Sequence, residues 1–216
     1  MSDEPEAEGG RWLAGRLRNA VLQRGEATLA LSGGSSAPPM FDVLLAQDVP
    51  WKSVVIWQVD ERVAPDGHPE RNAGQLVDFP CRVELMPVTD DDLIAAADRY
   101  GRSLPDRFDV VHLGLGDDGH TASWPPGDRV VDSEDSCEVV AEFNGFLRMT
   151  LTPAIVNAAR SRLMLTYGAS KAPVMKRWLL HDPALPVDRV RTDDTWVMLD
   201  PAAAADLADH AGGTAE

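Results

Sequence analysis

Cysteine is scarce in this sequence, which contains only Cys81 and Cys137 among its 216 residues. The two lie far apart and lack metal-ligand spacing, so we expect free thiols in a reducing compartment rather than a disulfide. Long apolar runs are also missing, and the N-terminal MSDEPEAEGG lacks the apolar core of a signal peptide. These absences predict a cytoplasmic protein that makes no use of a membrane.

Basic residues are outnumbered, with 20 Lys and Arg against 35 Asp and Glu and a net charge of -15 at pH 7. A nucleic-acid surface requires a basic footprint on the protein, so this balance argues against a nucleic-acid partner. The same balance is compatible with an anionic small-molecule ligand if a few of the basic side chains gather in one cleft.

Short apolar segments alternate with helical patterns along the chain. Strands are predicted over residues 27–32, 54–59, 82–88, 108–116, 162–168 and 195–200. Helices are predicted over residues 12–21, 38–45, 91–104, 151–161 and 169–180. This alternation is typical of βαβ units, and it predicts a single-domain, Rossmann-like α/β fold with a mostly parallel sheet and helices on both faces. We expect a disordered segment over 1–10, the domain over 11–200, and an Ala-rich tail over 201–216, either a loose helix or disordered.

Polar clusters follow three of the predicted strands: LSGGSS over 31–36, DER over 60–62 and GDDGHTAS over 116–123. In open α/β sheets, ligands bind outside the carboxyl ends of the strands. The three clusters therefore predict one shared site at that edge of the sheet.

The segment GLGDDGH has the glycine spacing of a dinucleotide loop, but that motif needs a helix directly after its glycines. Two prolines in the following TASWPPG leave little room for one. Asp117, Asp118 and His120 are ingredients of a metal site, yet no paired-histidine spacing accompanies them. A third interpretation is metal-free, with glycines that let the backbone approach a ligand and His120 as an acid–base group. A structural histidine at a turn is the alternative to all three.

The Gly/Ser loop between the first strand and the following helix is suited to anion binding through backbone N–H groups and hydroxyls. It lacks the order of a nucleotide P-loop, and a plain tight turn is the alternative. Arg62, Arg148 and Lys171 lie near predicted element ends and are candidate cations for a phosphate, unless they are ordinary surface charges.

Several of these segments occur together in one known family. They are LSGGSS, VDERV with Asn72 downstream, FDVVHLGLGDDGHTAS, RMTLTPAIVNAAR, YGASKAPVMKRWL and LPVDRVR followed by WVMLD. The chain resembles the 6-phosphogluconolactonase branch of the glucosamine-6-phosphate isomerase/6-phosphogluconolactonase superfamily, over about residues 27–200. It departs from the family pattern at Arg71-Asn72, where Ser-Asn is usual, and at WPPG, where FPG is common.

The resemblance implies hydrolysis of 6-phospho-D-glucono-1,5-lactone in the oxidative pentose phosphate pathway, with no metal, no organic cofactor and a sugar-phosphate lactone as the small-molecule partner. We expect a monomer or a homodimer. His120 is the expected general base for water, and Asp60 either orients His120 or holds a sugar hydroxyl. Backbone amides near Gly33 and Gly34 are expected to stabilise the oxyanion. The predicted substrate contacts are Ser32, Gly33, Gly34, Ser35, Arg62, Asp118, Gly119, Arg148 and Lys171.

Three other functions stay open at this point. A sugar-phosphate isomerase or deaminase on the same fold would use the histidine and an acid for proton transfer between C1 and C2. A metal-dependent hydrolase would use Asp117, Asp118 and His120. A regulator that binds a sugar phosphate without turnover would need the binding residues alone.

Overall fold

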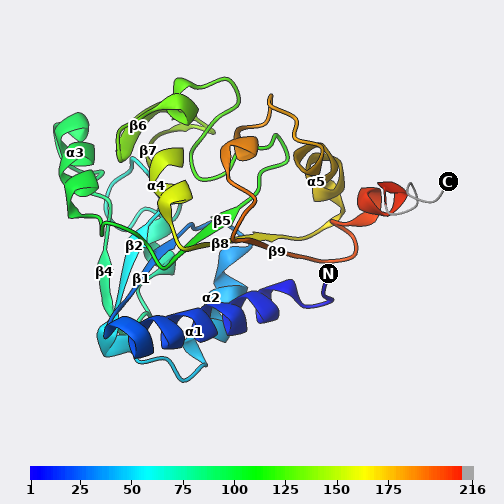
Figure 1. The fold of residues 1–216 in the computed structure, drawn as a ribbon. Helices are drawn as coiled ribbons and strands as arrows, with labels where there is room; N and C mark the ends of the chain where they lie inside the picture. Colours follow the sequence, from blue (N-terminus) through cyan, green and yellow to red (C-terminus); the bar gives the residue numbers. More distant parts are fainter. Residues whose placement is uncertain (211–216) are drawn as a thin grey trace.

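A six-stranded parallel sheet forms the centre of the computed structural model, which describes residues 1–210 (Figure 1). The strand order is β4-β2-β1-β5-β8-β9. The bounds are β1 Ala27–Leu31, β2 Val54–Gln58, β4 Arg82–Glu84, β5 Val110–Gly114, β8 Ser161–Thr166 and β9 Thr195–Leu199. The central strands are buried on both faces, which is why they read as continuous apolar runs in the sequence. The predicted α/β fold class is confirmed.

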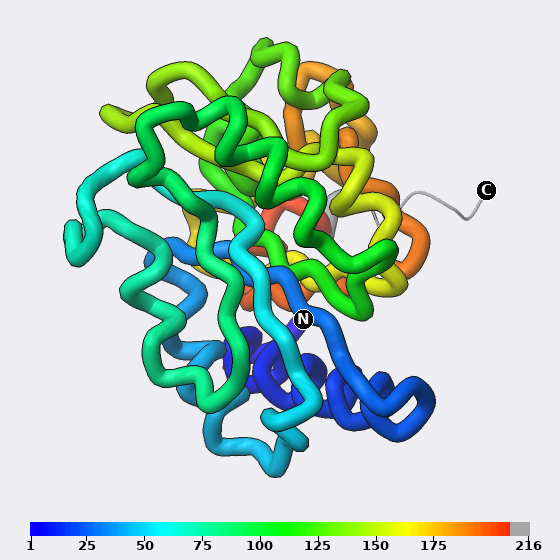
Figure 2. The backbone as a smooth tube through the Cα atoms, turned by 90° about the vertical axis from the view of Figure 1, so that its left-hand side faces the viewer, coloured from blue at the N-terminus to red at the C-terminus, as the bar shows by residue number. Residues whose placement is uncertain are grey.

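Helices cover both faces of this sheet. The helices are α1 Pro5–Arg24, α2 Ala37–Leu45, α3 Leu93–Ser103, α4 Pro153–Ala158 and α5 Ala172–Leu179. Figures 1 and 2 show α1 and α2 together on one side, with the other helices on the opposite side. Each layer has its own apolar core, one beneath α1 and α2 and one beneath α3 and α5. Among the described residues, no helix combines the length and the apolar character that crossing a bilayer requires.

A second, antiparallel sheet in the order β3-β7-β6 lies over the face opposite α1, and the sequence-based prediction does not contain it. Its strands are β3 Asp60–Arg62, β6 Cys137–Phe143 and β7 Phe146–Leu151. The DER segment is therefore a short strand of this sheet and not the end of β2. Trp124, which is fully buried, donates from its indole nitrogen to the carbonyl of Leu151 and ties the preceding loop to this sheet.

The expected disorder of residues 1–10 is wrong, because α1 begins at Pro5. Proline at the first helical position and Glu6 and Glu8 in the first turn suit a helix N-terminus. Gly9 and Gly10 are buried against α2, where a side chain at Gly10 would stand 2.8 Å from the carbonyl oxygen of Met40. Two glycines weaken a helix in isolation, but here they allow α1 and α2 to pack closely.

The Ala-rich segment after β9 is partly built into the fold. Ala203 and Ala204 are buried in the core beside α5, and a 3₁₀ helix covers Ala205–His210. Residues 211–216 of the predicted tail lie outside the described residues.

The order of the strands creates a crevice at the carboxyl edge of the parallel sheet. The chain leaves β1 toward β2 and β4, and it later returns to β5 before continuing to β8 and β9. The connections after β1 and β5 therefore run in opposite directions although the two strands are neighbours. Such a switch point is where open α/β sheets bind ligands. Both the Gly/Ser loop and the segment GLGDDGH leave the sheet here.

His112 on β5 is buried in the sheet interior, at 1% exposure, with its ring 6.1 Å from that of Phe41. Neither ring nitrogen has a hydrogen-bond partner among the described residues. Burial disfavours the charged imidazole, and it lowers the pKa of His112 to about 4, against 6.5 in model peptides. The folded protein therefore holds His112 neutral.

This histidine should make the protein sensitive to mild acid. Between pH 6.5 and pH 4 the unfolded chain binds a proton at His112 that the folded chain excludes, so the free energy of unfolding falls as the pH falls. The full effect is on the order of 3 kcal/mol. Urea unfolding of wild type and H112L should show a shallower pH slope in the variant over that range. Identical slopes would contradict the assignment.

Candidate active site

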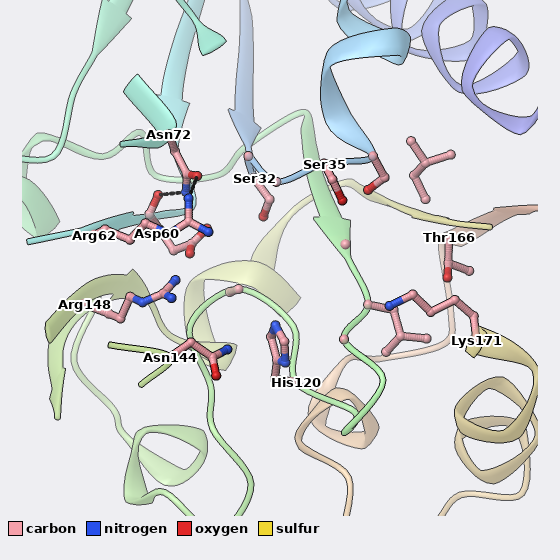
Figure 3. Close-up of a pocket in the computed structure, with 18 of the residues that line it drawn as sticks. Ser32, Ser35, Asp60, Arg62, Asn72, His120, Asn144, Arg148, Thr166 and Lys171 are labelled. Carbon is pink, nitrogen blue, oxygen red and sulfur yellow. Dashed lines mark hydrogen bonds between the residues drawn. The ribbon is translucent and has the colours of Figure 1, made fainter. Parts of the chain in front are cut away.

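A cavity of about 360 Å³ opens at the switch point, between the parallel sheet and the second sheet. Its size lies in the range of small-molecule sites. Nine of the predicted site residues line it: Ser32, Gly33, Gly34, Ser35, Asp60, Arg62, His120, Arg148 and Lys171. Figure 3 shows His120 between the two arginines on one side and Lys171 on the other. The predicted contacts Asp118 and Gly119 do not line the cavity, and each has a different role.

Asp118 holds the His120 ring. Its Oδ1 lies 2.5 Å from Nδ1 of His120 and also accepts a hydrogen bond of 3.1 Å from the backbone N–H of His120. Partial burial alone would raise the pKa of Asp118, but these two hydrogen bonds and the charge of the imidazole outweigh it and lower the pKa. With Nδ1 occupied, Nε2 is the ring nitrogen left for a ligand, and the side chain is 28% exposed.

The glycines around His120 close the loop and make room for the imidazole. The N–H of Gly116 donates to the carbonyl of His120, and the N–H of Gly119 donates to the carbonyl of Gly116. A Cβ at Gly116 would stand 2.1 Å from two ring atoms of His120, so the ring occupies the space of the missing side chain. Gly119 has φ +86° and faces Leu185, which explains why it is glycine and why it does not reach the cavity.

Asp60 points into the cavity from β3 but does not hydrogen-bond His120. Its Oδ2 accepts a hydrogen bond of 2.8 Å from Ser123, just beyond the histidine loop. Burial raises the pKa of the Asp60 carboxyl, while the hydrogen bond from Ser123 and the charge of Arg148 oppose the increase. Of the two roles predicted for Asp60, orienting His120 belongs to Asp118 in this structure.

The side chains of β3, which is the DER segment, lie in two different environments. Successive side chains of a strand point to opposite faces, so Asp60 and Arg62 face the cavity while Glu61 faces the interior. The Glu61 carboxylate is fully buried and lies 3.1 Å from Nε of Arg71. It also accepts four hydrogen bonds of 2.8 Å, from the side chain of Gln58 and from the backbone N–H groups of Arg62, Asn72 and Ala73. Glu61 thereby fixes β3 against the segment that follows it.

Arg62 and Arg148 are direct neighbours across the β3–β7 ladder, so two guanidinium groups share one wall of the cavity. Asn72 supports Arg62 by accepting a hydrogen bond of 3.1 Å from its Nη1. A Cβ at Gly33 would stand 2.4 Å from Oδ1 of Asn72, so the Gly/Ser loop needs glycine at this contact.

Lys171 reaches the cavity from the opposite side, at the start of α5. Its Nζ lies 2.6 Å from Oδ1 of Asp117. The pKa of Asp117 is below its usual range, chiefly because Lys171 donates a hydrogen bond to it. Asp117 thus pairs with Lys171, whereas Asp118 pairs with His120. Within residues 1–210, no group of three His, Cys, Asp or Glu side chains is arranged to hold a metal ion.

The Gly/Ser loop lines the cavity, but one of its predicted donors already has a partner. The N–H of Gly34 already donates to Oε1 of Gln75, so it is not free to stabilise an oxyanion. The buried hydroxyls of Ser32 and Thr166 have no hydrogen-bond partner among the described residues. Thr166 ends β8, and the sequence interpretation does not include it.

Asn144 is a further lining residue that the sequence interpretation missed. It belongs to the Asn144-Gly145 turn between β6 and β7, where φ is 51° and 82°. Asn-Gly between apolar residues is a strong hairpin signal, and it could have revealed this second sheet.

The chain is similar to one family along nearly its whole length. The family model for glucosamine-6-phosphate isomerases/6-phosphogluconolactonase matches residues 2–199. A 6-phosphogluconolactonase of Nostoc sp. is 33% identical over 178 residues, which cover 74% of each chain. One of Synechocystis sp. is 34% identical over 174 residues, covering 72% of each chain.

Solved structures share the fold. A 6-phosphogluconolactonase of Trypanosoma brucei superposes with a TM-score of 0.80 at 25% identity, covering 95% of each chain. A monomeric glucosamine-6-phosphate deaminase also superposes with a TM-score of 0.80, at 20% identity, covering 94% of this chain and 96% of its own. The fold alone therefore does not separate lactone hydrolysis from deamination.

The fit between Gly116 and His120 can be tested directly. In G116A the new methyl group would displace the imidazole, so the ring resonances of His120 should shift in a ¹H–¹³C NMR spectrum, assigned by their loss in H120N. G114A is the matched control, because Gly114 lines the same cavity and a Cβ there meets nothing within 4 Å. Unchanged His120 resonances in G116A would show that the ring does not depend on this glycine.

Proposed function

Because the chain belongs to the glucosamine-6-phosphate isomerase/6-phosphogluconolactonase family, we propose that it hydrolyses 6-phospho-D-glucono-1,5-lactone to 6-phospho-D-gluconate. The observation that carries the proposal is the His120 imidazole, held through Nδ1 by Asp118 and facing a cavity with three cationic side chains. Curated relatives more than 30% identical are named 6-phosphogluconolactonase, and this favours the lactonase over the deaminase activity on the shared fold.

His120 is the general base of the proposed reaction. Nε2 takes a proton from a water molecule, and the resulting hydroxide forms a bond to C1 of the lactone. The carbonyl becomes a tetrahedral oxyanion. When the bond between C1 and the ring oxygen breaks, Nε2 returns its proton to that oxygen. The net change is the addition of one water molecule, and it requires no metal or organic cofactor.

The two aspartates have separate roles in this scheme. Asp118 keeps the proton on Nδ1 and stabilises the imidazolium that forms when Nε2 accepts its proton. Asp60, buried and hydrogen-bonded to Ser123, holds a hydroxyl of the sugar. A buried carboxylate with one free oxygen is a strong acceptor for such a hydroxyl.

The cations bind the anionic end of the substrate and orient the ring. Arg62 and Arg148 lie side by side, an arrangement suited to a phosphate because each guanidinium presents a planar fork of donors. Lys171 supplies a third positive charge, and in the free protein Asp117 holds it at the edge of the cavity. A phosphate dianion would compete with Asp117 for Lys171.

The activity is tested with freshly prepared lactone in an assay coupled to 6-phosphogluconate oxidation, with spontaneous hydrolysis subtracted. We expect wild type to accelerate the reaction and H120N to lose about 10²–10⁴-fold in kcat with an unchanged melting temperature. Ammonia release from glucosamine-6-phosphate is measured in parallel. Release of ammonia without lactone hydrolysis would support the deaminase alternative, and normal turnover by H120N would exclude the proposed base.

Removing the Arg148 side chain should weaken substrate binding more than it slows the chemical step. R148A loses charge-assisted hydrogen bonds to the phosphate, so KM should rise about 10-fold or more while kcat changes less. Because Arg148 is buried, R148A could lower stability, and R148K, which keeps the positive charge, serves as a second variant if R148A does not fold. R102A is the control, because Arg102 is an exposed arginine paired with Asp98 on α3. An unchanged KM in both Arg148 variants would place the phosphate elsewhere.

A further inference from the structure

The tip of the β6–β7 hairpin lies against the active site. Phe143 and Phe146 are cross-strand partners that close the two-residue Asn144-Gly145 turn. Asn144 lines the cavity, and Figure 3 shows it between Arg148 and His120. None of the segments that carry the family resemblance includes this tip.

Phe143 contacts both the histidine and one arginine. Its ring centroid lies 5.0 Å from that of His120 with the two planes at 79°, an edge-to-face contact. The Cζ of Arg148 lies 5.6 Å from the same ring centroid. Nε of Arg148 also donates a hydrogen bond of 3.1 Å to the backbone carbonyl of Phe143. One aromatic side chain thus contacts both the proposed base and a proposed phosphate-binding group.

We propose that Phe143 is a positioning residue for the reaction, which sets the place of the His120 imidazole and of the Arg148 guanidinium relative to each other. This inference rests on the proposed function for its kinetic consequences. Phe143 itself does not line the cavity, so it acts through its two neighbours.

The imidazole needs this third contact. Gly116 leaves space on one side of the ring, and Asp118 holds Nδ1, but a ring held at one atom can still tilt about that contact. Phe143 restricts the tilt from another side. Small displacements of a catalytic group are costly, because proton transfer depends on both distance and direction.

The guanidinium of Arg148 gains two restraints from the same residue. The carbonyl of Phe143 anchors Nε, and the aromatic ring attracts the cation, so the remaining nitrogens stay directed at the cavity. The backbone anchor survives substitution of the side chain, whereas the cation–π contact does not. Substituting Phe143 should therefore weaken phosphate binding only in part.

Phe146 provides a matched control on the same hairpin. Like Phe143 it is half-buried and flanks the turn, but its ring lies 5.6 Å from His68, away from the site. A change that acts only by loosening the hairpin should have equal effects at the two positions.

The experiment compares F143A, F143L, F143Y and F146A by lactone hydrolysis and thermal unfolding. We expect F143A to lower kcat about 10-fold. We expect both F143A and F143L to raise KM about 2–5-fold, since neither keeps the aromatic face under Arg148. F143Y, which keeps the ring, and F146A should stay within about twofold of wild type in both constants. F143L preserves apolar volume and keeps the test valid if F143A does not fold.

A second readout does not depend on lactonase activity. The ring resonances of His120 should shift in F143A and F143L, because the ring current of Phe143 is lost, and should stay in place in F146A. The dissociation constant for 6-phosphogluconate, measured by calorimetry, should rise in F143L and not in F146A. If wild type fails to hydrolyse the lactone, the proposed function falls, and the NMR comparison still tests whether the Phe143 ring contacts His120. The positioning role of Phe143 would be overturned by equal kinetic losses in F143A and F146A, or by His120 resonances that do not move in F143L.

Discussion

The buried carboxylate of Glu61 is the interaction on which the active site depends. A carboxylate without solvent is costly unless every oxygen is satisfied, and Glu61 meets that condition with four hydrogen bonds and the guanidinium of Arg71. Three of those bonds come from the backbone, so the carboxylate determines where the chain runs. It holds β3 above the crevice between β1 and β5, and only from that position do Asp60 and Arg62 reach the cavity. Arg71 marks a departure from the family pattern, and it serves this buried ion pair.

The histidine has a comparable set of supports, each of a different physical kind. Gly116 contributes empty space, Asp118 contributes a charged hydrogen bond, and Phe143 contributes aromatic contact. The three come from the loop after β5 and from the hairpin of the second sheet. The site therefore lies at the junction between two sheets, and the relative positions of its side chains depend on how the two sheets pack.

Prediction from the sequence succeeded where a local pattern has one physical cause. Continuous apolar runs indicated the parallel strands, because strands buried on two faces exclude polar side chains. Polar clusters after those strands indicated the cavity, since the carboxyl ends of parallel strands meet at one edge. The prediction was wrong for residues 1–10, because α1 begins at Pro5 and Gly9 and Gly10 pack against α2. It also lacked the second sheet, whose strand β3 has only the three residues Asp60–Arg62.

By itself, the sequence determined the fold class, the family and the residue types that meet at the strand ends, because these follow from periodicity and from motifs contiguous in the chain. Only the tertiary structure decided which carboxylate serves the histidine. The sequence-based prediction considered Asp60 for this role and counted Asp118 among the substrate contacts, yet Asp60 accepts a hydrogen bond from Ser123 and Asp118 holds Nδ1 of His120. The tertiary structure also decided that Phe143, from a hairpin with no recognised motif, contacts both His120 and Arg148. Such contacts join segments that are distant in the chain, and their geometry depends on the packing of whole sheets rather than on any local pattern.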